Sequence, residues 1–289
     1  MSGARRFEGP IDLHTHSRVS DGTQTPRELM LDAAASGIRT VALTDHDSTA
    51  GWAEAAEAAA EARITLIRGM EFSTRVRGTS VHLLAYLFDP DDPGIVAETG
   101  RIRDARFDRA QRMVERIGAD YPLTWEDVLA QAQDGTTIGR PHIADALVER
   151  GHAATRTDAF GGILHWRAGY YQPHYAPEPM EAVRLVTAAG GVPVLAHPAT
   201  RGVGDIVSEQ RLGQLVDAGL FGLELDHREN KPEPRARLEQ MAKRYGLAIT
   251  GSSDYHGAGK VNRLGENTTT PEVLDRLIER ASGVPPLYA

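Results

Sequence analysis

The sequence contains no cysteine, so neither disulfide bonds nor thiolate metal ligands exist in this 289-residue protein. It also has no apolar run of about 18 residues, the shortest stretch that normally crosses a bilayer. Residues 1–9 are polar and basic and lack the apolar core of a secretory signal, so we expect a cytoplasmic protein that has no membrane partner.

Acidic side chains outnumber basic ones, 40 to 32, so the formal net charge is −8, and no basic stripe is visible. A surface of this kind is unsuited to following an extended nucleic acid. A protein of this charge that acts on an anionic substrate must concentrate positive charge locally, through arginines or metal ions. The sequence does not indicate an oligomeric state.

Seven short apolar runs of about strand length recur along the chain, and most end in polar residues. They are residues 11–16, 40–46, 64–71, 81–88, 192–197, 220–227 and 247–256. Helical patterns lie between them, and Thr25-Pro26-Arg27-Glu28 and Thr270-Pro271 are typical helix starts. Alternating strands and helices predict an α/β protein with a parallel sheet, and seven units predict a closed or nearly closed, TIM-like barrel.

The fourth and fifth runs are too far apart for a single connecting helix. Amphipathic stretches at 101–117, 125–132 and 141–149, followed by a Tyr/Pro-rich loop at 170–177, occupy the interval. We therefore expect residues 99–177 to form a small helical insertion and residues 1–98 and 178–289 to form the barrel. An insertion after the carboxyl end of a strand would cover the mouth where barrel active sites lie.

Potential metal ligands cluster at the ends of the runs. His14 and His16 alternate on one strand and so share a face. The loop after the first run carries Asp21. The other runs carry further histidines and carboxylates at their ends, namely His46, Glu71, His82, His197, Asp254 and His256. Because several strands aim these side chains at one end of a barrel, we expect a metal site. Imidazole and carboxylate without thiolate suit manganese, iron or zinc better than calcium.

The ordered motifs His-x-His, Thr-Asp-His, Gly-x-Glu-x-Ser, His, Ala-His-Pro and Ser-Asp-x-His resemble those of the polymerase and histidinol phosphatase (PHP) family. Their spacing and the insertion are most similar to the subgroup that includes the 3′,5′-nucleoside bisphosphate phosphatases. The resemblance covers residues 11–257 and implies a distorted (β/α)7 barrel and two or three divalent metals, with manganese favoured. It implies three ligand sets: His14, His16, Glu71 and Asp254; Glu71, His82 and His197; and Asp21, His46 and His256.

The resemblance also implies that a metal-bridging hydroxide hydrolyses the phosphomonoester of a small nucleotide, with Glu71 as the bridging carboxylate. His227 is a candidate proton donor to the leaving group. Candidate substrate contacts are Arg140 and His142 in the Gly-Arg-Pro-His stretch, Arg201, and His174. Gln172 stands where the subgroup has a lysine, which puts a contact to a second phosphate in question, although His174 could substitute in part.

Three alternatives stay open at this stage. Within the same fold, the chain could be a histidinol phosphatase or a phosphodiesterase of cyclic nucleotides or oligonucleotides. An amidohydrolase also begins with His-x-His, but the bridging acid here ends the third run and the last motif is Asp-x-His, which disfavours it. A non-catalytic PHP module that serves a polymerase is disfavoured because no ligand position is lost.

Overall fold

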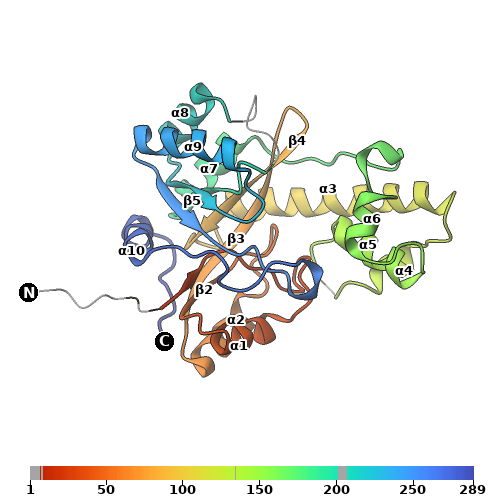
Figure 1. Cartoon of the computed structure of the whole chain (residues 1–289), viewed down its shortest axis with the longest axis horizontal. Coiled ribbons are helices and arrows are strands. Elements are labelled where there is room, and N and C mark those ends of the chain that lie inside the picture. Colours follow the sequence, from red (N-terminus) through yellow and green to blue (C-terminus); the bar gives the residue numbers. More distant parts are fainter. Residues whose placement is uncertain (1–6, 8, 134, 201–206) are drawn as a thin grey trace, which may run out of the picture.

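The computed structural model describes residues 7, 9–133, 135–200 and 207–289 (Figure 1). Seven strands form one sheet in sequence order. They are β1 (Ile11–Asp12), β2 (Thr40–Leu43), β3 (Thr65–Val76), β4 (Thr79–Tyr86), β5 (Val192–Ala196), β6 (Gly222–Asp226) and β7 (Ala248–Gly251). Each lies within or overlaps one of the seven apolar runs, so the sequence located every strand.

Helices lie between and after these strands in the described part of the chain. They are α1 (Pro26–Ala35), α2 (Trp52–Ala62), α3 (Pro93–Gly118), α4 (Trp125–Leu129), α5 (Arg140–Glu149), α6 (Arg156–Gly161), α7 (Pro179–Ala188), α8 (Glu209–Ala218), α9 (Pro232–Tyr245) and α10 (Pro271–Arg280), with 3-10 turns η1 (Trp166–Ala168) and η2 (Gly257–Gly259). The capping box at α1 is confirmed, because the Thr25 side chain accepts from the Glu28 N–H and Glu28 accepts from the Thr25 N–H. None of the helices among these residues combines the length and hydrophobicity that crossing a membrane requires.

The sheet is parallel except around β4, which pairs antiparallel with both β3 and β5. The prediction of an all-parallel sheet is therefore wrong at this strand. Only Arg77 and Gly78 separate β3 from β4, and both have positive φ, 45° and 83°. Two residues make a tight hairpin turn, whereas a parallel crossover requires about ten or more.

The two edges of the sheet meet beyond the ends of β1 and β7. Thr15 forms a parallel bridge with Tyr255, and the His16 N–H donates to the Tyr255 carbonyl at 2.8 Å. The prediction of a distorted, nearly closed (β/α)7 barrel is confirmed.

Side chains along each strand point alternately out of and into the barrel, so the apolar residues form two clusters. Outward residues such as Leu66 and Leu195 pack under the helices, whereas Ile67, Leu84 and Val194 belong to a second cluster that fills the barrel interior. The inward face of β3 continues from Ile67 to Glu71. One end of the barrel is thus closed by apolar side chains, and the other end presents polar ones.

The insertion has a hydrophobic cluster of its own, formed by α3, α4, α5 and α6 (Figure 1). Helix α3 joins the two bodies: Ile95 and Ile102 pack into the barrel cluster, whereas Ala110 and Ile117 pack into that of the insertion. The expected boundary at 98/99 falls inside this helix, so the division into 1–98, 99–177 and 178–289 stays a prediction.

The path into the insertion differs from the predicted one. Because β4 runs antiparallel, its final residue, Tyr86, lies at the end of the barrel away from His82, and α3 starts there. The helix has 26 residues and therefore extends about 39 Å. It returns along the barrel to the ligand-bearing end, where Arg106 Nε lies 2.9 Å from Asp47 Oδ2.

Candidate metal centre

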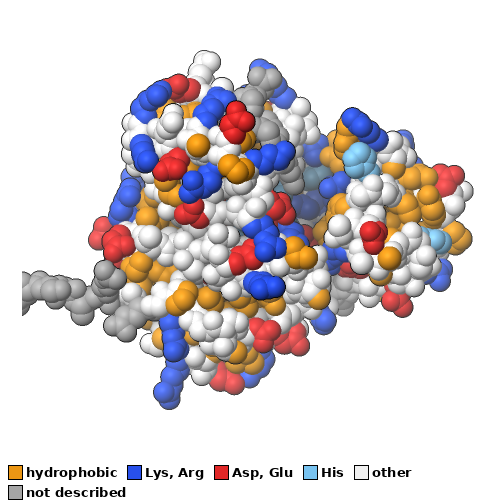
Figure 2. Space-filling model, in the orientation of Figure 1, with side chains coloured by type: hydrophobic (Ala, Val, Ile, Leu, Met, Phe, Trp, Pro, Cys, Tyr) orange, Lys and Arg blue, Asp and Glu red, His pale blue; other side chains and the backbone are white. Residues whose placement is uncertain are grey.

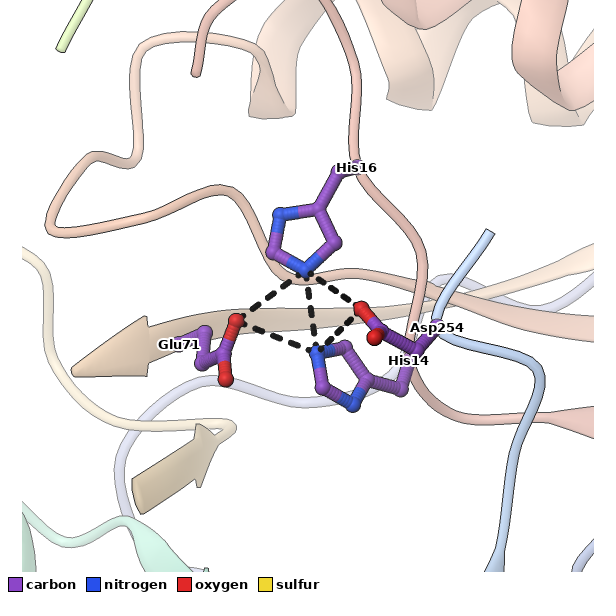
Figure 3. A group of neighbouring side chains, drawn as sticks. All are labelled: His14, His16, Glu71 and Asp254. Carbon is purple, nitrogen blue, oxygen red and sulfur yellow. Dashed lines mark hydrogen bonds and ion pairs between the residues drawn. The ribbon is translucent and has the colours of Figure 1, made fainter. Parts of the chain in front are cut away.

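Four side chains from three separate parts of the chain point toward one another at the polar end of the barrel (Figure 3). The Nε2 atoms of His14 and His16 are 2.9 Å apart. Glu71 Oε2 lies 3.2 Å and 3.1 Å from them, and Asp254 Oδ1 lies 3.4 Å from each. Two imidazole nitrogens and two carboxylate oxygens converging on one point form a donor set that suits a divalent transition metal.

The other carboxylate oxygen of Glu71 faces a second pair of histidines. Glu71 Oε1 lies 2.6 Å from His82 Nδ1 and 3.1 Å from His197 Nε2. His46 also approaches Glu71, with Nδ1 3.3 Å from Oε2. Glu71 therefore lies between two groups of nitrogen donors, which is the placement a bridging carboxylate requires.

A third group forms around Asp21. Its Oδ1 lies 3.2 Å from His256 Nε2 and 3.7 Å from His16 Nδ1, and its Oδ2 lies 3.7 Å from His46 Nε2. His46 thus stands between Asp21 and Glu71. The structure brings together all nine residues that the sequence suggested as metal ligands.

Opposite charges within this cluster stabilise one another against the cost of burial. Burial would raise the pKa of Glu71, but His82, His46 and His14 outweigh it and hold the pKa well below its usual value. Burial would lower the pKa of His16, yet hydrogen bonds to Asp254 and Glu71 raise it to about 9. Buried carboxylates and imidazoles in this number are stable only when opposite charges or ions compensate them.

Glu224 is a buried participant that the sequence interpretation missed. Its Oε1 lies 3.0 Å from His14 Nδ1, and its Oε2 accepts the backbone N–H of His197 at 2.9 Å. Burial raises the pKa of Glu224, but His14, His227 and His197 together lower it to about 2. As an ionised acceptor at Nδ1, Glu224 keeps a proton on that atom of His14, so Nε2 is the nitrogen that would give up its proton and bind a metal.

The second carboxylate oxygen of Asp254, Oδ2, faces two further side chains. Oδ2 lies 2.6 Å from Lys260 Nζ and 3.4 Å from His227 Nε2. The Glu229 N–H donates to His227 Nδ1, so the proton of a neutral His227 resides on Nε2 and faces Asp254. The role of His227 as proton donor to a leaving group stays a prediction.

The backbone is strained at three positions in and beside the cluster. Asp254, His197 and Asp47 have φ values of 53°, 27° and 52°, all in the left-handed region that non-glycine residues rarely adopt. Strain of this kind persists when surrounding contacts impose it, and it concentrates at functional sites. At Asp47 those contacts are visible, because its carboxylate accepts from the Ser73 N–H at 2.7 Å and from Ser73 Oγ at 2.6 Å.

Asp45 fixes the loop that carries Asp21. Its carboxylate accepts hydrogen bonds from the backbone N–H and hydroxyl of Ser17 and from the hydroxyl of Ser20. Ser20 Oγ in turn lies 3.3 Å from His16 Nδ1. Asp45 thereby supports two of the candidate ligands without touching the centre itself.

Comparison with known proteins agrees with this geometry. The chain is 32% identical over 265 residues to a 3′,5′-nucleoside bisphosphate phosphatase of Chromobacterium violaceum, and the match spans 91% of this chain and 93% of that protein. The profile of the PHP domain matches residues 12–133. The chain belongs to the PHP family.

Two further relatives bear on what this PHP protein does. It is 33% identical over 265 residues to a phosphoribosyl 1,2-cyclic phosphate 1,2-diphosphodiesterase of Eggerthella lenta, spanning 88% of this chain and 97% of that protein. A crystal structure from Bifidobacterium adolescentis, described as that of a metal-dependent phosphoesterase, superimposes with a TM-score of 0.91 at 44% identity and covers 95% of this chain and 98% of its own. The PHP protein described here is a metal-dependent phosphoesterase, and its buried histidine and carboxylate clusters fit divalent metals.

The structure describes three of the four predicted substrate contacts, all of them in the insertion and the loop that follows it. Arg140 begins α5 and lies over the rings of Phe160 and Tyr171, at 4.9 Å and 5.5 Å from their centroids. His142 is buried, and its Nδ1 accepts the Gly139 N–H at 3.1 Å, so it caps α5. Arg201 lies outside the described residues.

His174 lies in a strongly positive environment. Burial together with Arg109 and Arg106 lowers the pKa of His174 to about 2. Its Nδ1 donates to the Tyr175 carbonyl at 2.7 Å, which leaves Nε2 as an acceptor. His174 is therefore neutral here and does not by itself replace the charge of the lysine that the related subgroup has at the position of Gln172.

Proposed function

We propose that this PHP protein hydrolyses phosphomonoesters of small nucleotides, and that a nucleoside 3′,5′-bisphosphate, cleaved to the 5′-monophosphate and phosphate, is the favoured substrate. The observation that carries the proposal is the convergence of nine histidine and carboxylate side chains, Glu71 among them, at one end of the barrel. The likeness to the bisphosphate phosphatase, which extends over 93% of that relative, supports the choice of substrate.

We assign the donor atoms to three metal positions. His14, His16, Glu71 and Asp254 would hold one metal; Glu71, His82 and His197 would hold a second; and Asp21, His256 and His46 would hold a third, which His16 Nδ1 also approaches. His46 is close to both Asp21 and Glu71, so it could serve the second position as well. Imidazole and carboxylate donors without thiolate suit manganese, iron or zinc, and among these we favour manganese on the family resemblance.

When bound, the metals would acidify a shared water and neutralise charge on the phosphoryl oxygens. The remaining work belongs to the residues of the chain. Glu71 sets the spacing of the two donor groups, and Glu224 fixes the orientation and protonation of His14. Lys260 places a cation beside Asp254 on the wall of a pocket that His46, His82 and His197 also line. That pocket is the position we assign to the scissile phosphate.

A cyclic phosphodiesterase activity is the second candidate, since the relative from Eggerthella lenta is equally similar and carries that name. The two candidates differ in the bond that is cleaved. The first hydrolyses a terminal ester and releases inorganic phosphate, whereas the second begins by opening a cyclic diester, a step that itself releases no phosphate.

A substrate screen with added manganese, which follows both inorganic phosphate and the organic products by chromatography, separates the candidate functions. The substrates are adenosine 3′,5′-bisphosphate, a ribose cyclic phosphate, an oligonucleotide, histidinol phosphate and an amide. We expect release of inorganic phosphate from the bisphosphate at the highest kcat/KM. Opening of the cyclic phosphate alone would favour the second candidate, and hydrolysis of the amide alone would overturn the assignment as a phosphoesterase.

A further inference from the structure

Arg156 connects the helical insertion to the barrel loops that carry two of the candidate metal ligands. It is the first residue of α6, and only 14% of its side chain is exposed. Its Nε and Nη2 donate to the two carboxylate oxygens of Asp145 on α5, at 2.8 Å and 2.5 Å. A forked pair of this kind fixes the plane of the guanidinium and neutralises its charge. The direction of the remaining nitrogen, Nη1, is therefore fixed as well.

That nitrogen contacts the loop that carries Asp21. Nη1 of Arg156 donates to the backbone carbonyl of Asp21 at 3.0 Å. The carboxylate of Asp21 faces His256, His16 and His46, at distances of 3.2 Å, 3.7 Å and 3.7 Å. Arg156 thus holds the main chain of a residue whose side chain belongs to the third metal position.

The same guanidinium packs against η2, the turn that follows His256. The N–H of Gly259 donates to the His256 carbonyl at 3.2 Å. A Cβ at Gly259 would lie 2.3 Å from Nη1 of Arg156, so any other residue there would displace the guanidinium. Thr23 joins the two loops, because its N–H donates to the His256 carbonyl at 3.1 Å and its Oγ1 accepts from the Ala258 N–H at 2.8 Å. Arg156 therefore lies where the loops that carry Asp21 and His256 meet.

The insertion makes two more contacts with the Asp21 loop. The Thr137 N–H donates to the Val19 carbonyl at 3.0 Å, and Thr136 Oγ1 donates to the Arg18 carbonyl at 3.1 Å. Residues 18–21 form a turn outside the helices and strands, so contacts of this kind decide its position. Asp45 holds the turn from the barrel side, and the insertion holds it from the other body.

Polar contacts matter at this junction because the two bodies do not pack closely there. The surface is hollowed between the insertion and the barrel (Figure 2). A cavity of about 660 Å³ is lined by Thr23 and Gly259 of the barrel and by Asp145 and Arg156 of the insertion, among others. Across a gap without packed side chains, few contacts other than hydrogen bonds and ion pairs fix the distance between two bodies.

We propose that Arg156 and Asp145 are positioning residues that couple the insertion to the third metal position. The pair holds the Asp21 loop against η2, so that Asp21 and His256 are in place to bind a metal. The inference rests on the proposed metal-dependent function and concerns the control of that site. Because such coupling is reciprocal, filling the third position should also hold the insertion on the barrel.

The first test measures manganese binding. Chelator-treated wild type and variants are titrated with manganese alone, and free manganese is followed by electron paramagnetic resonance. In Arg156→Met, one of the three ions should bind about tenfold more weakly, as for residues that orient metal ligands, and the other two as in the wild type. Arg150→Met is the matched control, because it removes an ion pair within the insertion, that of Arg150 Nε with Asp127 Oδ2 at 3.1 Å. It should leave all three affinities unchanged.

The second test is amide hydrogen exchange, measured by mass spectrometry. In the metal-free protein, exchange in the peptide covering residues 17–23 should be about tenfold faster in Arg156→Met than in the wild type, because a hydrogen bond to a charged group is lost. Exchange in residues 40–46 should not change. Saturating manganese should slow exchange in α6 of the wild type and not in α6 of Arg156→Met.

Asp145→Asn tests whether the pair acts as a unit. The double variant should bind manganese like Arg156→Met alone, because Asp145 acts through Arg156. If Arg156→Met does not fold, Asp145→Asn is judged by the criteria given for it.

Three results would overturn the coupling: unchanged affinities and exchange in Arg156→Met, an equal effect of Arg150→Met, or equal weakening of all three ions, which indicates a general loosening. Failure of the underlying function looks different, since the wild type itself would then bind no manganese.

Discussion

Glu71 is in contact with five histidines, three through Oε2 and two through Oε1. Replacing it with glutamine keeps the shape and removes the charge that both donor groups share. We expect Glu71→Gln to lower kcat more than tenfold while the far-ultraviolet circular dichroism stays that of the wild type.

The matched control for that variant is Glu57→Gln, which makes the same chemical change at an exposed position on α2. It should keep wild-type turnover. A Glu71→Gln enzyme that retains more than about a tenth of the wild-type kcat would show that this carboxylate is peripheral to the reaction.

Glu224 contacts two residues of the centre, His14 and His197. Loss of its charge should allow the His14 ring to rotate or to change tautomer, because a neutral amide is a weaker acceptor for the Nδ1 proton. Replacing a residue that orients a metal ligand in this way typically lowers metal affinity about 10- to 100-fold. We expect Glu224→Gln to weaken manganese binding by that factor, measured by competition with a chelating dye, and equal affinities would refute its assigned role.

The metal-free protein should lose stability as the pH rises from about 6.5 to 9. His16 has its pKa raised to about 9, and that of His14 is also raised, so both are protonated in the folded state where they would be neutral in the unfolded chain. Their contribution to the free energy of unfolding is complete below about pH 6.5, the pKa of a histidine in the unfolded chain. It is lost as the pH rises past the pKa that each histidine has in the folded protein. His46 and His256 have lowered pKa values and affect stability below this window.

The measurement is the melting temperature of chelator-treated protein across that pH range, which should fall. Metal binding must displace the same protons, so manganese affinity should rise about tenfold per pH unit for each proton released. A melting temperature that rises toward pH 9, or a metal affinity independent of pH, would contradict the charge states inferred for His14 and His16.

The nine candidate ligands could be identified from the sequence because each follows or opens an apolar run. Glu224 was missed, although Leu223 and Leu225 on either side of it face outward and so indicate that it faces into the barrel.

At the scale of elements, β4 is where the sequence interpretation and the structure differ. His82 opens its apolar run, whereas the ligands on the neighbouring runs stand at or near their ends, and this reversal is the mark of an antiparallel strand. The interval between the third and fourth runs was also too short for a helix. Both signals were present in the sequence, but the regular alternation elsewhere favoured a parallel barrel.

Glycine substitutions test the geometry of the hairpin and of α3. Gly78 has φ of 83° in the β3–β4 turn, so a side chain there is strained although a Cβ would meet no atom within 4 Å. Gly100 lies within α3, where an added Cβ would also meet no atom within 4 Å and the φ is not positive. We expect Gly78→Ala to lower stability by about 1 kcal/mol and Gly100→Ala to raise it by about 0.5–1 kcal/mol.

Urea unfolding of the two variants beside the wild type measures these differences. Since both substitutions add the same methyl group, each serves as the control for the other. Stabilisation by Gly78→Ala would show that the turn does not have the positive φ that joins two antiparallel strands.

At the scale of the whole molecule, metal binding should contribute to stability, because the donors come from strands and loops distributed over most of the barrel. A ligand that binds only the folded state stabilises it by about 2.7 kcal/mol at a hundredfold excess over its dissociation constant. For a protein of this size, that corresponds to a rise of about 5–10 °C in melting temperature. Scanning calorimetry with and without manganese tests this, and an unchanged melting temperature would contradict the assigned metal positions.

The central claim is that this PHP protein hydrolyses phosphate esters through metals held around Glu71. The most direct measurement titrates chelator-treated protein with manganese and follows, in the same samples, bound metal per chain and phosphate release from adenosine 3′,5′-bisphosphate. We expect no phosphate release without metal and full activity at two to three bound ions per chain. The Glu71→Gln variant should not reach the wild-type activity at any manganese concentration. Phosphate release by the metal-free protein, or saturation of activity with less than about one ion per chain, would contradict the account.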